Sequence, residues 1–217
     1  MASTPTPAGS APPAESPGTV IGNHTHKYTA RNPAIRFLTE RFVGRLDALL
    51  GEVAACDKPV TTPLEVGAGE GVITLRLKQR FGTAVGLDLP DAGLRAEWRS
   101  RPGPFYVHGD AQRLPFRDDE FDLLVCVEVL EHLPDPARGL RELARVSRRH
   151  LVLSVPREPV FRTCNLAAGR YLSDLGNTPG HLNHWSTGQF VRFVSEVASV
   201  RRVEKPFPWT IVWAELS

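Results

Sequence analysis

Three glycines at alternate positions mark one short turn, the run Gly-Ala-Gly-Glu-Gly at residues 67–71. Glycine tolerates positive φ angles and has no Cβ to block a ligand, and the first N–H groups of a following helix have no partner inside that helix. Leu64 and Val66 predict a strand before the turn, and residues 72–82 predict a helix after it. This pattern favours an α/β fold in which the turn holds the polar end of a ligand.

The spacing of the glycines narrows the class of ligand. A dinucleotide fingerprint would need glycine at position 72, where this chain has valine, and the Gly-Lys-Ser/Thr of a phosphate-binding loop is missing. Glu65, two residues before the first glycine, suits a cationic amino group better than a pyrophosphate. For this motif alone, a glycine-rich turn without any ligand stays an alternative.

Acidic residues follow further predicted strands. Asp88 ends the apolar run 84–89 and could either accept hydrogen bonds from both hydroxyls of a ribose or cap the next helix. Asp110 follows a third strand and could accept a hydrogen bond from an adenine amine, while the strongly apolar run from residue 121 leads into Glu128. Because open α/β sheets bind ligands beyond the carboxyl ends of their strands, these acids predict a nucleotide-like site.

Taken in order, these four motifs resemble those of class I S-adenosylmethionine-dependent methyltransferases, in the type 11-like small-molecule branch that includes quinone-biosynthesis enzymes. The resemblance covers the chain from about Val60 to its end. It implies an α/β Rossmann-like three-layer sandwich, whose seven-stranded sheet is mostly parallel with an antiparallel C-terminal strand. The implied cofactor is S-adenosyl-L-methionine, and the residues expected to bind it are Glu65, Gly67, Ala68, Gly69, Asp88, Leu89, Asp110, Ala111 and Glu128.

Such an enzyme mainly has to hold a nucleophile in line with an already activated methyl group, so proximity supplies most of the catalysis. A hydroxyl or ammonium acceptor would also need a general base, for which His132 is the candidate and His181 or His184 the rivals. A structural hydrogen bond is an equally open explanation for His132. We predict no metal site, because His181 and His184 have no acidic residue near them in sequence.

The insertion at residues 156–185 is rich in aromatic, amide, imidazole and guanidinium groups, which a pocket for a small polar or aromatic acceptor requires. Its individual members could equally satisfy the backbone of a long loop. The residues expected to bind the acceptor are Tyr28, Arg162, Tyr171, Asn183 and Trp185.

The expected organisation is a disordered Pro/Ala/Ser/Thr-rich tail at 1–23 and a single methyltransferase domain at 24–217. Within the domain we expect a helical lid (24–58), a cofactor-binding half (60–155), the substrate-side insertion (156–185) and a closing helix with two antiparallel strands (186–217).

Composition excludes several classes of partner. The 217 residues carry a formal net charge of +2, which gives no strong attraction to nucleic acid or membrane. Three cysteines without C-x-x-C spacing and the lack of a signal or spanning segment predict a cytoplasmic protein. We expect a small-molecule acceptor methylated on oxygen, with a homodimer as one possible assembly. The alternatives are N- or C-methylation, an NAD(P)-dependent oxidoreductase and a catalytically silent homologue.

Overall fold

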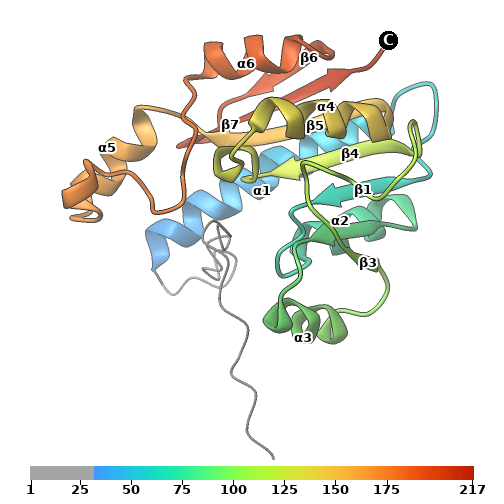
Figure 1. The fold of residues 1–217 in the computed structure, drawn as a ribbon, viewed down its shortest axis with the longest axis horizontal. Helices are drawn as coiled ribbons and strands as arrows, with labels where there is room; N and C mark the ends of the chain where they lie inside the picture. The colour runs from blue at the N-terminus through green and yellow to red at the C-terminus, as the bar shows by residue number, and fades with distance from the viewer. Residues whose placement is uncertain (1–31) are drawn as a thin grey trace, which may run out of the picture.

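The glycine turn lies at the point where the order in which the chain adds strands to the sheet reverses. The computed structural model describes residues 32–217, and its seven strands form one sheet in the order β3-β2-β1-β4-β5-β7-β6 (Figure 1). From β1 the chain adds β2 and then β3 on one side. It then crosses to the other side of β1 and adds β4, so the switch point lies between β1 and β4. The strands are β1 (Pro63–Val66), β2 (Val85–Asp88), β3 (Phe105–His108), β4 (Phe121–Val127), β5 (Ser147–Pro156), β6 (Ser199–Glu204) and β7 (Trp209–Glu215).

Only β7 runs against its neighbours: it pairs antiparallel with β5 and with β6, whereas β1 to β5 pair in parallel. The predicted mostly parallel sheet with an antiparallel C-terminal strand is thus confirmed. The helices are α1 (Pro33–Ala54), α2 (Val72–Phe81), α3 (Ala92–Ser100), α4 (Pro136–Val146), α5 (Val160–Ala167) and α6 (Thr187–Ser195), with short 3₁₀ turns η2 (Leu130–His132) and η3 (Leu172–Asp174).

The middle strand shows why the architecture has three layers. All residues of β4 are buried, as expected for a parallel strand covered on both faces. Leu124 and Cys126 point into a core shared with α4 and α6, whereas Leu123 and Val125 point into a second core shared with α1 and α2. Side chains that alternate along a strand therefore build two cores, one on each side of the sheet.

The helix boundaries follow local signals in the sequence. Asn32 caps α1, with Pro33 in its first turn, and Asp135 with Pro136 starts α4 in the same way. A capping box between Ser186 and Gln189 opens α6. Each of these starts follows from a short sequence signal, because capping depends on residues that are close together in the chain.

The second half of α1 belongs to the core. Phe42, Leu46, Leu49 and Val53 are buried, and the ring of Phe42 packs edge-on against that of Trp209 with centroids 5.2 Å apart. These contacts confine any movable lid to residues before Phe42. Tyr28, the proposed acceptor-binding residue of that segment, and the predicted tail at 1–23 lie outside the described residues.

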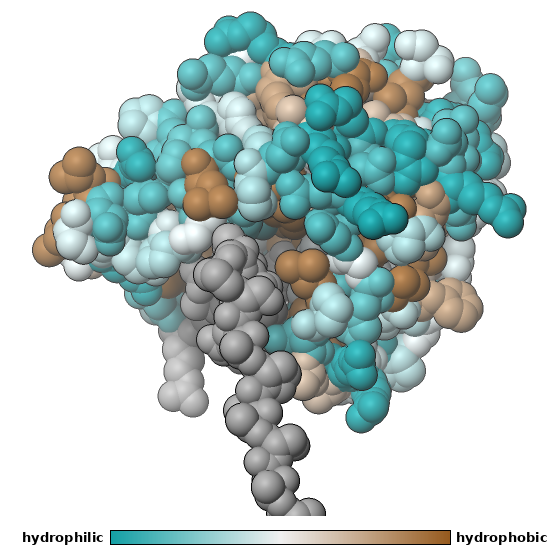
Figure 2. All heavy atoms as spheres, in the orientation of Figure 1, coloured by the Kyte–Doolittle hydropathy of each residue, from teal (hydrophilic) through white to brown (hydrophobic). Residues whose placement is uncertain are grey.

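The insertion projects from the edge of the sheet at which β4 and β5 end, where α5 extends beyond the arrowheads of β1 and β4 (Figure 1). Hydrophobic side chains gather on its outer surface (Figure 2), and Leu166, Leu172 and Leu175 are exposed there. Among the described residues, no helix combines the length and the apolar character needed to span a bilayer. All three cysteines are free thiols, as the absence of a disulfide pattern predicted.

Candidate active site

The glycine turn is held close to both flanking strands. The amides of Gly67 and Ala68 donate to the carbonyl oxygen of Leu87 in β2, at 2.8 and 3.0 Å. Gly67 has a φ of +83°, and a Cβ there would overlap the side chain of Val129, which follows β4. Gly69, in contrast, has open space where a Cβ would lie. The turn is therefore tight on the protein side and accessible at its middle glycine.

Asp88 ties the end of β2 to this turn. The Gly69 amide donates to its Oδ2 at 2.6 Å, and the Leu89 amide donates to its Oδ1 at 2.7 Å. A carboxylate can accept about four hydrogen bonds, so these two bonds are compatible with contacts to the hydroxyls of a sugar. The structure thus joins Gly67, Gly69 and Asp88, as the sequence predicted.

Glu65 lies beneath the turn and is almost completely buried. Burial raises its pKa to about 8, against the lowering effect of a hydrogen bond from the Thr74 hydroxyl, and the neighbouring charge of Asp88 adds to the rise. The uncharged carboxyl is thus the dominant form at neutral pH in this structure. A cationic group above the turn would favour the ionised form.

Two aromatic residues that the sequence analysis missed support the turn from the other side. The Trp98 indole N–H donates to the Gly69 carbonyl at 2.8 Å, and its ring stacks on Tyr106 with centroids 4.6 Å apart. A Cβ at Gly71 would overlap the Tyr106 hydroxyl, which shows how closely that ring approaches. The spacing of Leu94 and Trp98 on one face of α3 was the only sequence signal for this contact.

Asp110 and Ala111 follow β3, at the same edge of the sheet as Asp88. Asp110 is exposed, and its Oδ1 accepts a hydrogen bond from the Gln112 amide at 2.8 Å, which shapes the turn. Ala111 is buried against the core, while Leu89 is 40% exposed beside Asp88. The structure places all these residues beyond the ends of neighbouring strands.

Glu128 has a left-handed backbone, with φ +58°, directly after β4. Its Oε1 accepts a hydrogen bond from the Ser154 hydroxyl at 3.1 Å, and its Oε2 accepts one from the Trp209 indole N–H at 2.7 Å. Ser154 and Trp209 were not predicted as site residues, since they come from β5 and β7. These bonds fix the carboxylate at the switch point.

His132 and His181 come together although they are far apart in sequence. Their rings meet edge to face with centroids 4.9 Å apart, and His132 Nδ1 lies 2.8 Å from the Gly180 carbonyl oxygen. Because a carbonyl only accepts hydrogen bonds, Nδ1 carries the proton in the neutral ring and Nε2 has the lone pair. The buried Glu131 brings a carboxylate within 4.8 Å of ligand atoms on both histidines.

This arrangement corrects the argument used against a metal, because the acidic partner that His181 lacks in sequence is supplied in space by Glu131. The contact is built by the backbone: Leu182 and Asn183 donate to the Glu131 carbonyl at 2.8 and 3.0 Å. The Asn183 side-chain amide donates to the Leu133 carbonyl at 2.7 Å, so this predicted acceptor-binding residue anchors the insertion to the end of β4.

His184 makes different contacts from the other two histidines. Its Nε2 lies 2.8 Å from Asn177 Oδ1 and 3.4 Å from an Arg162 guanidinium nitrogen. Burial, together with the Arg162 charge, lowers the pKa of His184. Trp185 packs its ring against Phe193, with centroids 5.4 Å apart, on the core side. Tyr171 is half-buried at the start of η3, in a left-handed conformation.

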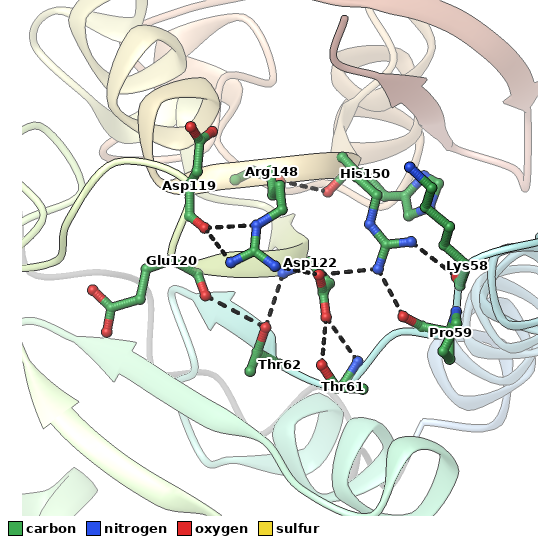
Figure 3. A network of polar contacts seen from close by, with 11 residues as sticks. Lys58, Pro59, Thr61, Thr62, Asp119, Glu120, Asp122, Arg148 and His150 are labelled. Carbon is green, nitrogen blue, oxygen red and sulfur yellow. Dashed lines mark hydrogen bonds and ion pairs between the residues drawn. The ribbon is translucent and has the colours of Figure 1, made fainter.

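A second polar cluster lies at the opposite ends of β4 and β5 (Figure 3). Asp122 Oδ2 accepts hydrogen bonds from the Thr61 amide and hydroxyl at 2.9 and 2.7 Å, and its Oδ1 lies 3.0 Å from an Arg149 nitrogen. Burial alone would raise the pKa of Asp122, but the hydrogen bonds from Thr61 and the Arg149 guanidinium outweigh it and hold that pKa well below its usual range.

Cys56, His150 and Glu215 lie beside this network, with ligand atoms within 4.8 Å of one another. Burial and nearby acids raise the pKa of the Cys56 thiol, and burial together with Arg149 lowers that of His150. A protonated thiol next to an arginine is a poor ligand for a cation. The geometry therefore favours the glycine turn, and not this cluster, as the functional site.

Together, the switch-point turn, the acids beyond successive parallel strands and the closing antiparallel strand define a Rossmann-like α/β protein with a nucleotide-type ligand site. Residues 64–153 match the sequence profile of a family described as "Methyltransferase domain". This stretch of the chain is therefore similar to a methyltransferase domain.

Curated relatives match a part of the chain. A demethylmenaquinone methyltransferase of Corynebacterium kroppenstedtii is 37% identical over 111 residues, which is 49% of this chain and 48% of that protein. A ubiquinone biosynthesis O-methyltransferase of Pseudomonas fluorescens is 30% identical over 95 residues, 38% of each chain. The chain thus spans about half the length, or less, of the curated relatives it matches.

Solved structures resemble a larger share of the chain. Magnesium protoporphyrin IX methyltransferase from Synechocystis PCC 6803 with bound S-adenosylhomocysteine aligns with a TM-score of 0.66. The alignment covers 87% of this chain and 89% of that one at 18% identity. At this level of identity the likeness confirms the fold.

Proposed function

We propose that this protein transfers a methyl group from S-adenosylmethionine to a small-molecule acceptor. The observation that carries the proposal is the link between the glycine turn and the acid of β2, where Asp88 holds the Gly69 amide at 2.6 Å. The accessible Cβ position of Gly69 and the buried Glu65 below it suit a ligand with a sugar hydroxyl pair and a cationic amino group.

Each residue of the turn has a distinct task in this proposal. Asp88 would accept hydrogen bonds from the ribose hydroxyls, and Asp110 would accept one from the adenine amine. Glu65 would face the amino group, which would favour its ionised form. Glu128, fixed by Ser154 and Trp209, would border the reactive end of the cofactor.

The bound cofactor supplies an activated methyl on a sulfonium, which leaves a neutral thioether behind. The protein's main contribution is to orient the acceptor, and the insertion is suited to this. Phe161 lies between His181 and Trp209, with ring centroids 5.8 and 6.3 Å apart. Aromatic rings from α5 and β7 would hold a flat or apolar acceptor beside Glu128.

His132 is our candidate for the general base. Its protonated Nδ1 is fixed on the Gly180 carbonyl, so its Nε2 has the lone pair that an acceptor hydroxyl could protonate. Replacing His132 by Gln should lower kcat by about a hundredfold or more without changing cofactor affinity. His181→Gln and His184→Gln test the two rival rings. Wild-type turnover in all three variants, with acceptor bound normally, would contradict an acid–base role.

Cofactor binding is tested by calorimetry and thermal shift. S-adenosylhomocysteine should bind and raise the melting temperature, whereas NAD(P) should have no effect. The reverse result would favour an oxidoreductase, and no binding of either would favour a silent homologue. Transfer of a tritiated methyl group to candidate acceptors then tests catalysis itself.

The finer assignments are also proposals. We favour oxygen as the methylated atom and a cytoplasmic protein that is either a monomer or a homodimer. Matches to quinone-pathway methyltransferases support a small aromatic acceptor of this kind. Product analysis by mass spectrometry would distinguish O- from N- and C-methylation.

A further inference from the structure

Among the residues that the structure describes, two arginines of the insertion lack the partners that a guanidinium usually has. Arg157 follows β5, three residues beyond the Ser154 that holds Glu128, and Arg162 lies in α5 directly after Phe161. Both side chains are half-buried, and the Nε atom of each is shielded from solvent without a hydrogen bond. Within residues 32–217, neither guanidinium forms an ion pair. A half-buried cation without a counter-ion is unfavourable unless a ligand supplies hydrogen-bond acceptors and a negative charge.

The neighbours of Arg162 do not satisfy it. The Asn177 amide nitrogen points to the His181 carbonyl at 3.3 Å, so its Oδ1 faces His184 and accepts the proton of Nε2 at 2.8 Å. Arg162 therefore meets an N–H, not a lone pair, at 3.4 Å from that nitrogen. The neutral form of His184, favoured by its lowered pKa, agrees with this assignment.

Glu158 lies between the two arginines in sequence and, among the described residues, forms an ion pair with neither of them. Glu158 Oε2 accepts a hydrogen bond from the Arg162 main-chain amide at 3.3 Å, near the start of α5. Its carboxylate thus serves the helix start, where backbone N–H groups need acceptors. The Arg157 main-chain amide donates to the Pro208 carbonyl at 3.0 Å, which fixes its backbone but leaves the guanidinium unserved.

We propose that the methyl acceptor carries an anionic group, a carboxylate or a phosphate, and that Arg157 and Arg162 bind it. This inference rests on the proposed methyl transfer: Arg162 directly follows Phe161 in α5, and the Phe161 ring lies 5.8 Å from that of His181, the partner of the candidate base His132. A guanidinium presents planar pairs of donors that match carboxylate and phosphate oxygens. The acceptor class is then an aromatic or apolar molecule with a negatively charged substituent.

The test uses the full chain saturated with S-adenosylhomocysteine, with benzoate, phenyl phosphate and neutral benzyl alcohol as probes at constant ionic strength. At least one anion should bind more tightly than benzyl alcohol, and the preferred anion distinguishes a carboxylate from a phosphate. Arg162→Gln and Arg157→Gln should each weaken that binding by roughly tenfold. Arg170→Gln, which removes an exposed arginine of the same insertion, should change it less than about twofold.

A stability measurement separates ligand binding from a structural role. Without anion, Arg162→Gln should melt no lower than the wild type, because it removes an uncompensated charge, and Arg162→Lys should bind the anion with intermediate affinity. Equal binding of benzoate, phenyl phosphate and benzyl alcohol, or equal effects of Arg162→Gln and Arg170→Gln, would overturn the proposal. So would no anion binding up to tens of millimolar. If S-adenosylhomocysteine itself fails to bind, the proposed function falls instead.

Discussion

The two ends of strands β4 and β5 carry similar residues in opposite states. At the beginning of these strands, Arg149 lies 3.0 Å from Asp122 and donates to the carbonyl oxygens of Lys58 and Pro59 (Figure 3). Just beyond their other end, Arg157 has no such partners among the described residues, although it is also half-buried. Within the described residues, an arginine at one end thus has its partners inside the protein, whereas an arginine at the other end has none for its guanidinium.

This difference separates stability from function. Fully paired charges hold strand starts in place and leave little capacity to bind anything else. Charged groups without partners and strained backbone conformations lower stability. They persist at sites where a bound ligand supplies the missing interactions. The left-handed Glu128 and the buried Glu65, with its raised pKa, belong to the second kind. We therefore expect substitutions at the two ends to affect different measurements.

The largest effect is expected at the paired end. Asp122→Ala removes the acceptor of two Thr61 hydrogen bonds and the partner of Arg149, so it should lower the free energy of unfolding by about 3 kcal/mol. Denaturant unfolding measures this, with Asp118→Ala as a control for an exposed ion pair. Cofactor affinity should be unchanged. A large loss of affinity would mean that the two ends of these strands do not have separate roles.

Asp122 also has a predictable pH signature. Its folded pKa is depressed, so its contribution is fully present above the unfolded value of about 4 and is lost as the pH falls below that value. Wild-type stability should therefore decrease below about pH 4 more steeply than that of Asp122→Ala. If the free energy of unfolding fell equally steeply with pH for the two proteins below pH 4, this assignment would be contradicted.

Glu65 should give the opposite pH dependence. Its folded pKa of about 8 lies above the usual value of 4.5 for a glutamate, so its favourable contribution is complete below pH 4.5 and is lost as the pH rises through 8. Glu65→Gln should remove this slope and, without cofactor, be more stable than the wild type at pH 8.5. Thermal unfolding across this range measures it. Identical profiles would mean that Glu65 is ionised in the folded protein.

At the turn, Asp88→Asn should weaken S-adenosylhomocysteine binding by about thirtyfold, or about 2 kcal/mol, because a charged acceptor for the sugar is lost. Calorimetry measures the affinity. Asp91→Asn is the control, since Asp91 caps α3 through the Leu94 amide. If both variants bind equally well, Asp88 serves only to hold the turn.

The smallest effect, a change in kcat/KM, is expected for one of the two tryptophans of β7. Trp209→Phe removes the donor to Glu128 and should reduce kcat/KM by roughly fivefold, about 1 kcal/mol. Trp213→Phe removes an indole N–H that lies 3.4 Å from His150 at the paired end and should leave kcat/KM unchanged. Steady-state kinetics on an identified acceptor distinguishes the two. An equal loss in both would mean that the substitutions act through the sheet as a whole.

Much of the cofactor side was predictable from sequence. Gly67, Gly69 and Asp88 lie within about twenty positions of one another, and the rule for parallel strands brings them to one edge. The capping residues of α1, α4 and α6 set their starts for the same local reason. Trp98 and Trp209, which hold the turn and Glu128, carried no motif, because their contacts depend on how separate elements pack.

The order of strands and helices, the glycine turn and the acids that follow the strands could be inferred from the amino-acid sequence alone, since each depends on short-range periodicity or on residues that are neighbours in the chain. The packing of distant segments was needed to show that Glu131, His132 and His181 meet and that, within residues 32–217, Arg149 forms an ion pair whereas Arg162 forms none. These partnerships join residues that are far apart in the chain: Asp122 and Arg149 are 27 positions apart (149 − 122), and Glu131 and His181 are 50 positions apart (181 − 131). Burial, register and the docking of the insertion fix them, and no local pattern encodes these.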